Sequence, residues 1–95
     1  MSKLWAEGEY QITNSIYVDA VERRAGGAGI RRNEIINKCK QATNRQFDGS
    51  VLIHLGNLTA ARLALGLSIL PEFSPLANYP KKLAVFLENL QSKRT

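Results

Sequence analysis

The fold of this chain is decided by the run GNLTAARLALGLS, residues 56–68. Asn57 and Thr59 are residue types that cap helices, and the leucines that follow them are spread nearly all around the helical circumference. A helix that is apolar on so much of its surface has to be central to a core or to a dimer. We therefore predict a helix from about residue 57 to Leu70, with the other helices packed around it.

Four other segments show helical patterns on either side of this centre. Their apolar residues recur at three- and four-residue spacing, and each segment begins or ends at a capping residue, a glycine or a proline. The segments are residues 3–10, then Thr13 or Asn14 to the Gly26-Gly27 pair, then about Ile30 to Gln41, and finally Asn78 to Leu90.

The fold class predicted is all-α, a small bundle of four to five short helices. Residues 51–55 are β-branched and apolar enough to permit a short strand, or they open a helix that Gly56 interrupts; no second strand is evident to pair with them, so we favour the helix. Asp48-Gly49 before them is typical of a turn. The chain is expected to be one helical domain over residues 1–95, with residues 92–95 frayed. The predicted core is Ile16, Tyr17, Ile35, Ile36, Leu55, Leu65, Phe86 and Leu90.

Charge is distributed unevenly along the chain. Residues 1–22 carry a net −3 and residues 46–95 a net +2, whereas residues 23–45 carry +6 and exceed the +5 of the whole chain. Clustered lysines and arginines attract phosphates through a term that weakens with salt. We predict that this segment binds nucleic acid, with DNA as the expected form, or else an acidic protein surface. The candidate contact residues are Arg23, Arg24, Arg31, Arg32, Lys38, Lys40 and Arg45.

Apolar residues at the end of the central helix exceed what one small core absorbs, so a symmetric homodimer is expected. Its predicted interface is Leu63, Leu67, Leu70 and Phe73. The same apolar surface supports a second interpretation of function, an adaptor or inhibitor of phage or plasmid type that binds another protein and no nucleic acid. The first interpretation is a small non-enzymatic regulatory protein that binds DNA.

Residues 56–68 resemble the first helix and turn of the Fis-type helix-turn-helix, whose usual run is close to Gly-Asn-x-Thr-x-Ala-Ala-x-x-Leu-Gly-Ile/Leu-Ser. The resemblance implies a DNA-reading helix after Gly66. Pro71 and Pro75 fall where that helix would run, and residues 69–76 hold no Arg, Lys, Asn or Gln to contact base edges. The residues themselves favour a core helix, with Arg62 as an exposed side chain on it.

The N-terminal residues Glu7-Gly8-Glu9-Tyr10, Ile16-Tyr17 and Ala20 resemble the turn and second helix of a tetratricopeptide-like hairpin, similar to the pattern in small bacterial regulators related to PerC. One such unit cannot bury its own apolar face. The resemblance therefore implies a helical hairpin at the N-terminus that packs on the rest of the chain.

Residues typical of reaction chemistry are scarce. Cys39 and His54 are the only cysteine and histidine, so one chain offers neither a disulfide nor a zinc site, and Cys39 is expected to be a small buried apolar residue. No phosphate-binding loop or paired-cysteine motif is present. We expect no enzyme activity, no cofactor and no metal. No run is apolar for long enough to suggest a membrane span, so a cytoplasmic location is expected.

Overall fold

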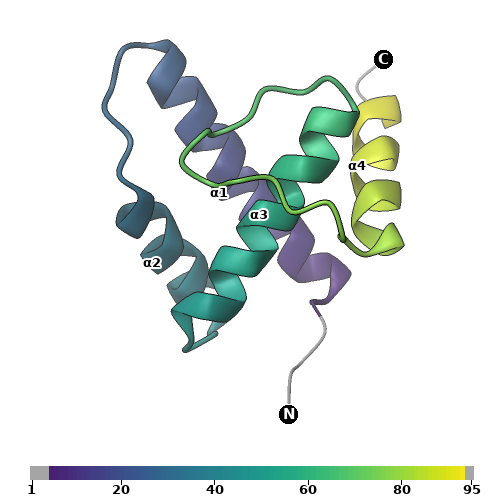
Figure 1. Cartoon of the computed structure of the whole chain (residues 1–95), viewed down its shortest axis with the longest axis horizontal. Helices are drawn as coiled ribbons and strands as arrows, with labels where there is room; N and C mark the ends of the chain where they lie inside the picture. Colours follow the sequence, from purple (N-terminus) through teal and green to yellow (C-terminus); the bar gives the residue numbers. More distant parts are fainter. Residues whose placement is uncertain (1–4, 94–95) are drawn as a thin grey trace.

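The structure is a computed structural model that describes residues 5–93, and within this range it contains four α-helices and no strand (Figure 1). Helices α1 and α3 each contact both of the other two helices, α2 and α4. The all-α prediction is confirmed, and residues 51–55 are helical. The helices are α1 (Glu7–Ala25), α2 (Arg32–Thr43), α3 (Asp48–Ala64) and α4 (Lys81–Lys93).

Helix α3 is the central helix, as residues 56–68 predict, but it begins earlier and ends earlier than expected. Val51, Leu55 and Leu58 on it are fully buried. The Asp48-Gly49 pair, which we predicted as a turn, forms its first turn. A carboxylate is favourable there because the amino end of a helix carries partial positive charge.

Helix α1 is one continuous helix, so the predicted break before Thr13 and Asn14 is wrong. Both residues are buried within it, and they face α3. Thr13 Oγ1 lies 2.8 Å from His54 Nε2, and Asn14 Oδ1 accepts a hydrogen bond of 3.0 Å from Arg62. Thr13 and Asn14 share the buried face of α1 with Tyr10, Tyr17 and Ala20, so apolar spacing alone does not reveal that the helix is continuous.

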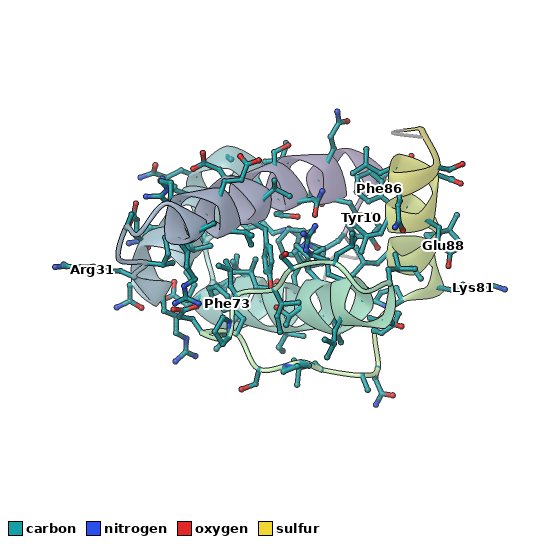
Figure 2. All side chains as sticks on the ribbon, turned by 90° about the horizontal axis from the view of Figure 1, so that it is seen from above. Tyr10, Arg31, Phe73, Lys81, Phe86 and Glu88 are labelled. Carbon is teal, nitrogen blue, oxygen red and sulfur yellow. The ribbon has the colours of Figure 1, made fainter. Side chains whose placement is uncertain are left out.

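Helices α2 and α4 pack their apolar faces on the two longer helices (Figure 2). Leu83 and Leu87 of α4 are buried, and Phe86 is half-buried against them. Helix α4 runs through Ser92 to Lys93, so the first two residues of the predicted frayed tail are helical, while residues 94–95 lie outside the described range. Helix α2 begins and ends two residues later than predicted.

The carboxyl end of α3 closes on Gly66, which has a φ of +73°. Gly66 N–H donates to the Leu63 carbonyl (3.0 Å) and Leu67 N–H to the Arg62 carbonyl (2.9 Å). This pair of bonds is the Schellman arrangement, in which a left-handed glycine terminates a helix. Gly66 therefore ends α3, and residues 65–80 contain no helix. The DNA-reading helix implied by the helix-turn-helix resemblance is absent from this position.

The connection between α3 and α4, residues 65–80, crosses over α3 (Figure 1) and is fixed along its length. Leu70 and Phe73 are buried, and Leu70 N–H donates to the Tyr17 hydroxyl at 2.7 Å. Farther along, Leu76 N–H donates to the Gly56 carbonyl at 3.0 Å. A Cβ at Gly56 would lie 2.8 Å from Leu76 side-chain atoms and 2.9 Å from the Ser74 carbonyl oxygen, so only glycine permits this crossing.

The core contains most of the residues predicted for it. Tyr17, Ile35, Ile36 and Leu55 are buried. The other four are half-buried. Three of these, Ile16, Leu65 and Phe86, pack against the core cluster, whereas Leu90 lies outside it. Tyr17 is the most constrained of the core side chains, because its hydroxyl also lies 2.7 Å from Thr59 Oγ1.

Candidate binding surfaces

Five of the seven candidate contact residues in segment 23–45 are held in ion pairs within the molecule. Most of these pairs are partly exposed, and such pairs contribute little to stability. These ion pairs nevertheless neutralise positive charge that the sequence predicted to be available for binding a polyanion. The pairs are Arg23 with Asp19 (3.2 Å) and Glu34 (3.4 Å), Arg24 with Glu72, Lys38 with Glu34 (3.3 Å), Lys40 with Asp48 (2.7 Å) and Arg45 with Glu9 (2.9 Å).

Arg45 is the most firmly held of these residues. Its Nε and Nη2 each donate to a different carboxylate oxygen of Glu9 at 2.9 Å, and its guanidinium carbon lies 3.7 Å from the centre of the Trp5 ring. The hydrogen bond from Arg45 lowers the pKa of Glu9, although burial opposes the shift. A two-pronged pair with a stacked aromatic face is a strong arrangement for arginine. Arg45 therefore joins α1 to the loop before α3.

Carboxylates from outside residues 23–45 cancel most of the positive charge that is gathered in this segment. Seven cations and Glu34 give this segment its net +6. Four more carboxylates, all from outside it, pair with it in the fold and leave a net +2. Among residues 5–93, Arg31 and Arg32 are the two members of the segment without an ion pair, and both are exposed. Arg31 projects from one end of the molecule (Figure 2).

Arg32 borders an apolar hollow that the sequence did not indicate. The hollow has a volume of about 250 Å³ and lies where the 65–80 connection meets α3. Ile53 and Leu76 in it are 58% and 42% exposed, which is high for large apolar side chains. The hollow is lined by Arg32, Leu52, Ile53, Glu72, Ser74 and Leu76. We refer to these residues together with Arg31 as the basic–apolar face.

No sequence signal identifies this face, because it joins three segments. Ile53 lies in an apolar run that is typical of a core helix, and Val51, His54 and Leu55 close to it in α3 are buried. Leu76 lies in the irregular connection, and its position over α3 depends on the close approach at Gly56. The basic segment predicted from the sequence includes Arg31 and Arg32, but it does not indicate the apolar residues beside them.

The four residues of the predicted dimer interface lie in different environments. Leu70 and Phe73 are buried in the core of one chain, so they are not available to a second copy. They are buried because the 65–80 connection folds back over the core, a feature that apolar spacing in a helix does not reveal. Leu63 is 53% exposed and Leu67 is half-buried. The homodimer stays a prediction that now involves at most these two leucines.

Arg62 is buried, and its predicted exposure is wrong. It is 7% exposed, and its guanidinium lies 5.1 Å from the centre of the Tyr17 ring. Its Nε donates to the Ser68 carbonyl (2.9 Å) and its Nη1 to Asn14 Oδ1 (3.0 Å). The cation thus links α3 to α1 and to the chain that follows Gly66, where the resemblance would have placed a phosphate contact.

We expect Arg62→Ala to lower the free energy of unfolding by about 2 kcal/mol, because Asn14 Oδ1 and the Ser68 carbonyl lose a buried charged donor. Urea denaturation followed by circular dichroism measures this change. Arg32→Ala is the control, since an exposed side chain without an ion pair should change stability by no more than about 0.5 kcal/mol. Equal stability of the two variants would contradict the structural role of Arg62.

Cys39 and His54 lie in separate environments. Cys39 is fully buried, and burial raises the pKa of its thiol to about 12, which keeps it protonated and unreactive. His54 is hydrogen-bonded to the Thr13 hydroxyl through Nε2. Among residues 5–93, no three potential metal-ligating side chains come together. In the same range, every helix is too short or too polar to cross a bilayer.

The chain was compared with protein-family models, with curated proteins and with solved structures. None of these three comparisons finds a match.

Proposed function

We propose that this chain is a small non-enzymatic regulatory protein that acts by binding an acidic segment of another protein at the basic–apolar face. One observation carries the proposal: an unpaired arginine, Arg32, shares a hollow with the exposed side chains of Ile53 and Leu76. Large apolar side chains that cluster on a surface are typical of protein-binding sites, and arginine is enriched there. Arg31, next in the chain, adds a second exposed cation.

Nucleic acid is the weaker candidate for this face. Binding to a phosphate backbone depends on several cations acting together, and most of those in segment 23–45 are paired with carboxylates. A duplex would also leave Ile53 and Leu76 uncovered or place them against charged phosphates. An acidic, partly apolar protein segment can pair its carboxylates with Arg31 and Arg32 and at the same time cover the Ile53 and Leu76 side chains.

Selection from a displayed library of random peptides tests the proposal with a defined probe. We expect the selected peptides to combine Asp or Glu with large apolar residues. Binding of a selected peptide should weaken by about tenfold or more in Ile53→Asp and in the double variant Arg31→Glu/Arg32→Glu, since each removes one of the two kinds of contact. Lys81→Glu/Lys82→Glu is the matched control, because it makes the same charge change at exposed residues of α4.

A mixed-sequence DNA duplex, followed by fluorescence anisotropy, provides the opposing test. We expect weak binding at moderate salt that the apolar variant Ile53→Asp leaves unchanged. Tight duplex binding that falls steeply with salt and is lost in Arg31→Glu/Arg32→Glu would replace the proposed function with nucleic-acid binding. Peptide binding that survives Ile53→Asp would also overturn it.

A further inference from the structure

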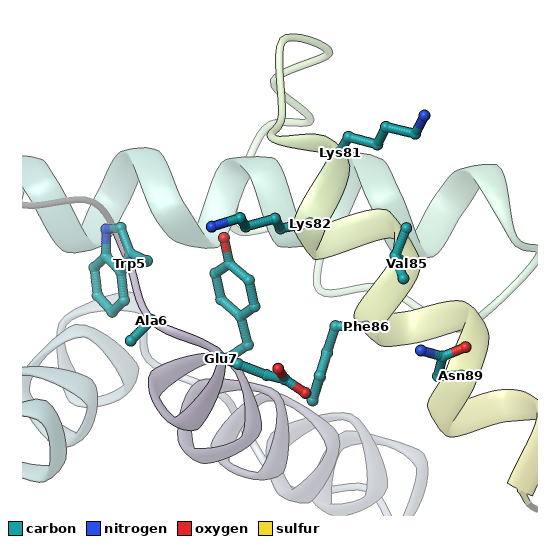
Figure 3. Close-up of a pocket in the computed structure, with 9 residues that line it drawn as sticks. Trp5, Ala6, Glu7, Lys81, Lys82, Val85, Phe86 and Asn89 are labelled. Atoms are coloured by element: carbon teal, nitrogen blue, oxygen red, sulfur yellow. The ribbon is translucent and has the colours of Figure 1, made fainter.

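A second hollow, larger than that of the basic–apolar face, lies between the beginning of α1 and helix α4 (Figure 3). Its volume of about 440 Å³ is within the range of pockets that hold small molecules. Three of its walls are aromatic rings, those of Trp5, Tyr10 and Phe86. Neither the charge pattern nor the apolar spacing of the sequence predicts this groove.

The aromatic walls are fixed before any ligand arrives. The Trp5 ring stacks on His54, with ring centres 3.9 Å apart and planes 11° from parallel, and Arg45 covers its other face. Tyr10 stacks on the far side of His54 at 5.7 Å and contacts Phe86 at 5.9 Å with a tilt of 56°. A wall whose side chains are already ordered loses little entropy when a flat ring packs against it.

The rim of the groove carries two lysines and one carboxylate. Figure 3 shows Lys82 reaching across the groove toward Trp5, whereas Lys81 points away from it. Glu7 lies at the opposite rim, and all three side chains are exposed. Among residues 5–93 neither lysine is ion-paired, and both stand at the amino end of α4, where the helix dipole adds to their positive charge. Charge complementarity therefore favours an anion at Lys82.

We infer that this groove binds a free small molecule made of a planar aromatic ring and one acidic group, with the ring against Tyr10, Phe86 and the open edge of Trp5, and the acid on Lys82 Nζ. The ring matches the aromatic walls, and the acid matches Lys82, the cation that reaches across the opening among residues 5–93 (Figure 3). The inference does not rest on the proposed function, because Lys81 and Arg31 project from opposite ends of the molecule (Figure 2).

Trp5, the only tryptophan of the chain, reports directly on occupation of the groove. Titration with phenyl phosphate should change its fluorescence in a saturable way with a Kd of about 1 mM, as expected for so small a ligand. Phenol and inorganic phosphate each carry one half of the proposed ligand, and each should bind at least about tenfold more weakly.

Two variants give the test its specificity. Lys82→Gln should weaken phenyl phosphate binding by about tenfold, because it removes a charge-assisted hydrogen bond. Lys81→Gln removes the same charge from the adjacent exposed residue and should change the Kd by less than about twofold, as for an exposed charge outside the contact. Unchanged circular dichroism in both variants shows that they are folded.

Three outcomes would overturn the inference. Equal losses in Lys81→Gln and Lys82→Gln would reduce the effect to general attraction of anions. An equal response to inorganic phosphate would mean that the aromatic walls play no part. A fluorescence response to removal of residues 1–3, with none to phenyl phosphate, would mean that the chain itself fills the groove.

Discussion

Replacing Phe73 by alanine should lower the free energy of unfolding by about 3–5 kcal/mol, the cost typical of removing a buried aromatic side chain. Phe73 is 1% exposed and lies in the middle of the 65–80 connection, which has no helix of its own. Its ring is the largest buried side chain of that connection. A small domain has a total stability of about 5–15 kcal/mol, so this loss is a large fraction of the total.

Urea denaturation measures the loss, and Leu76→Ala is the matched control. Leu76 belongs to the same connection but is 42% exposed, so its truncation should cost no more than about 1 kcal/mol. Light scattering on the folded proteins separates this explanation from the dimer prediction. If Phe73→Ala stays as stable as the parent protein but changes its mass in solution, Phe73 is an interface residue and its burial in the core is wrong.

Acidification should destabilise the protein through His54. Burial and, to a smaller extent, the nearby Arg45 lower the pKa of this histidine to about 4, while Glu9 opposes the shift. In the unfolded chain the imidazole takes up a proton below about pH 6.5, but in the folded chain it does not do so until about pH 4. Between about pH 6.5 and pH 4 the unfolded state therefore binds more protons than the folded state. The free energy of unfolding consequently decreases as the pH falls through this range.

The expected loss between about pH 7 and pH 5 is about 2 kcal/mol, which follows from the two pKa values. Chemical denaturation at a series of pH values measures it. His54 is the only histidine, so His54→Gln should remove most of the pH dependence in this range while lowering stability at neutral pH. A parent protein equally stable at both pH values would show that the imidazole is not buried in its neutral form.

The geometry around His54 explains why protonation is unfavourable there. Thr13 Oγ1 lies 2.8 Å from His54 Nε2 and is itself held 3.0 Å from the Glu9 carbonyl oxygen, so the neutral ring already has a buried partner. The ring is stacked between Trp5 and Tyr10 and is 3% exposed. A positive charge would be removed from water and would lie near the Arg45 guanidinium.

Apolar spacing predicted the parts of the fold in which one face of a helix is simply apolar. Helix α4 is the clearest case, since it forms where the spacing predicts it, although its buried leucines are Leu83 and Leu87 and the predicted core residues Phe86 and Leu90 are half-buried. The same rule failed for α1, because Thr13 and Asn14 face inward and hydrogen-bond to α3. Apolar spacing also failed at the end of α3. Pro71 argues against a recognition helix there, but nothing in the spacing indicates that Leu70 and Phe73 return to the core.

The candidate site was less predictable than the fold because charge along a sequence is not charge in space. Arg31 and Arg32 are exposed as predicted, whereas Arg45 pairs with Glu9, which is far from it in the sequence. The groove is harder still to foresee, because Trp5 and Phe86 lie near opposite ends of the chain. Such a site exists only once the beginning of α1 and helix α4 have packed together.

The ion pairs of segment 23–45 have a consequence for the unfolded chain, because most of them exist only in the folded one. Folding brings four carboxylates from α1, α3 and the 65–80 connection against this segment. When the chain is unfolded, the pairs with Glu9, Asp48 and Glu72 are lost, and the segment presents more of its net +6. We therefore expect unfolded molecules to attract polyanions more strongly than native ones, so that apparent nucleic-acid affinity rises as the native fraction of a preparation falls.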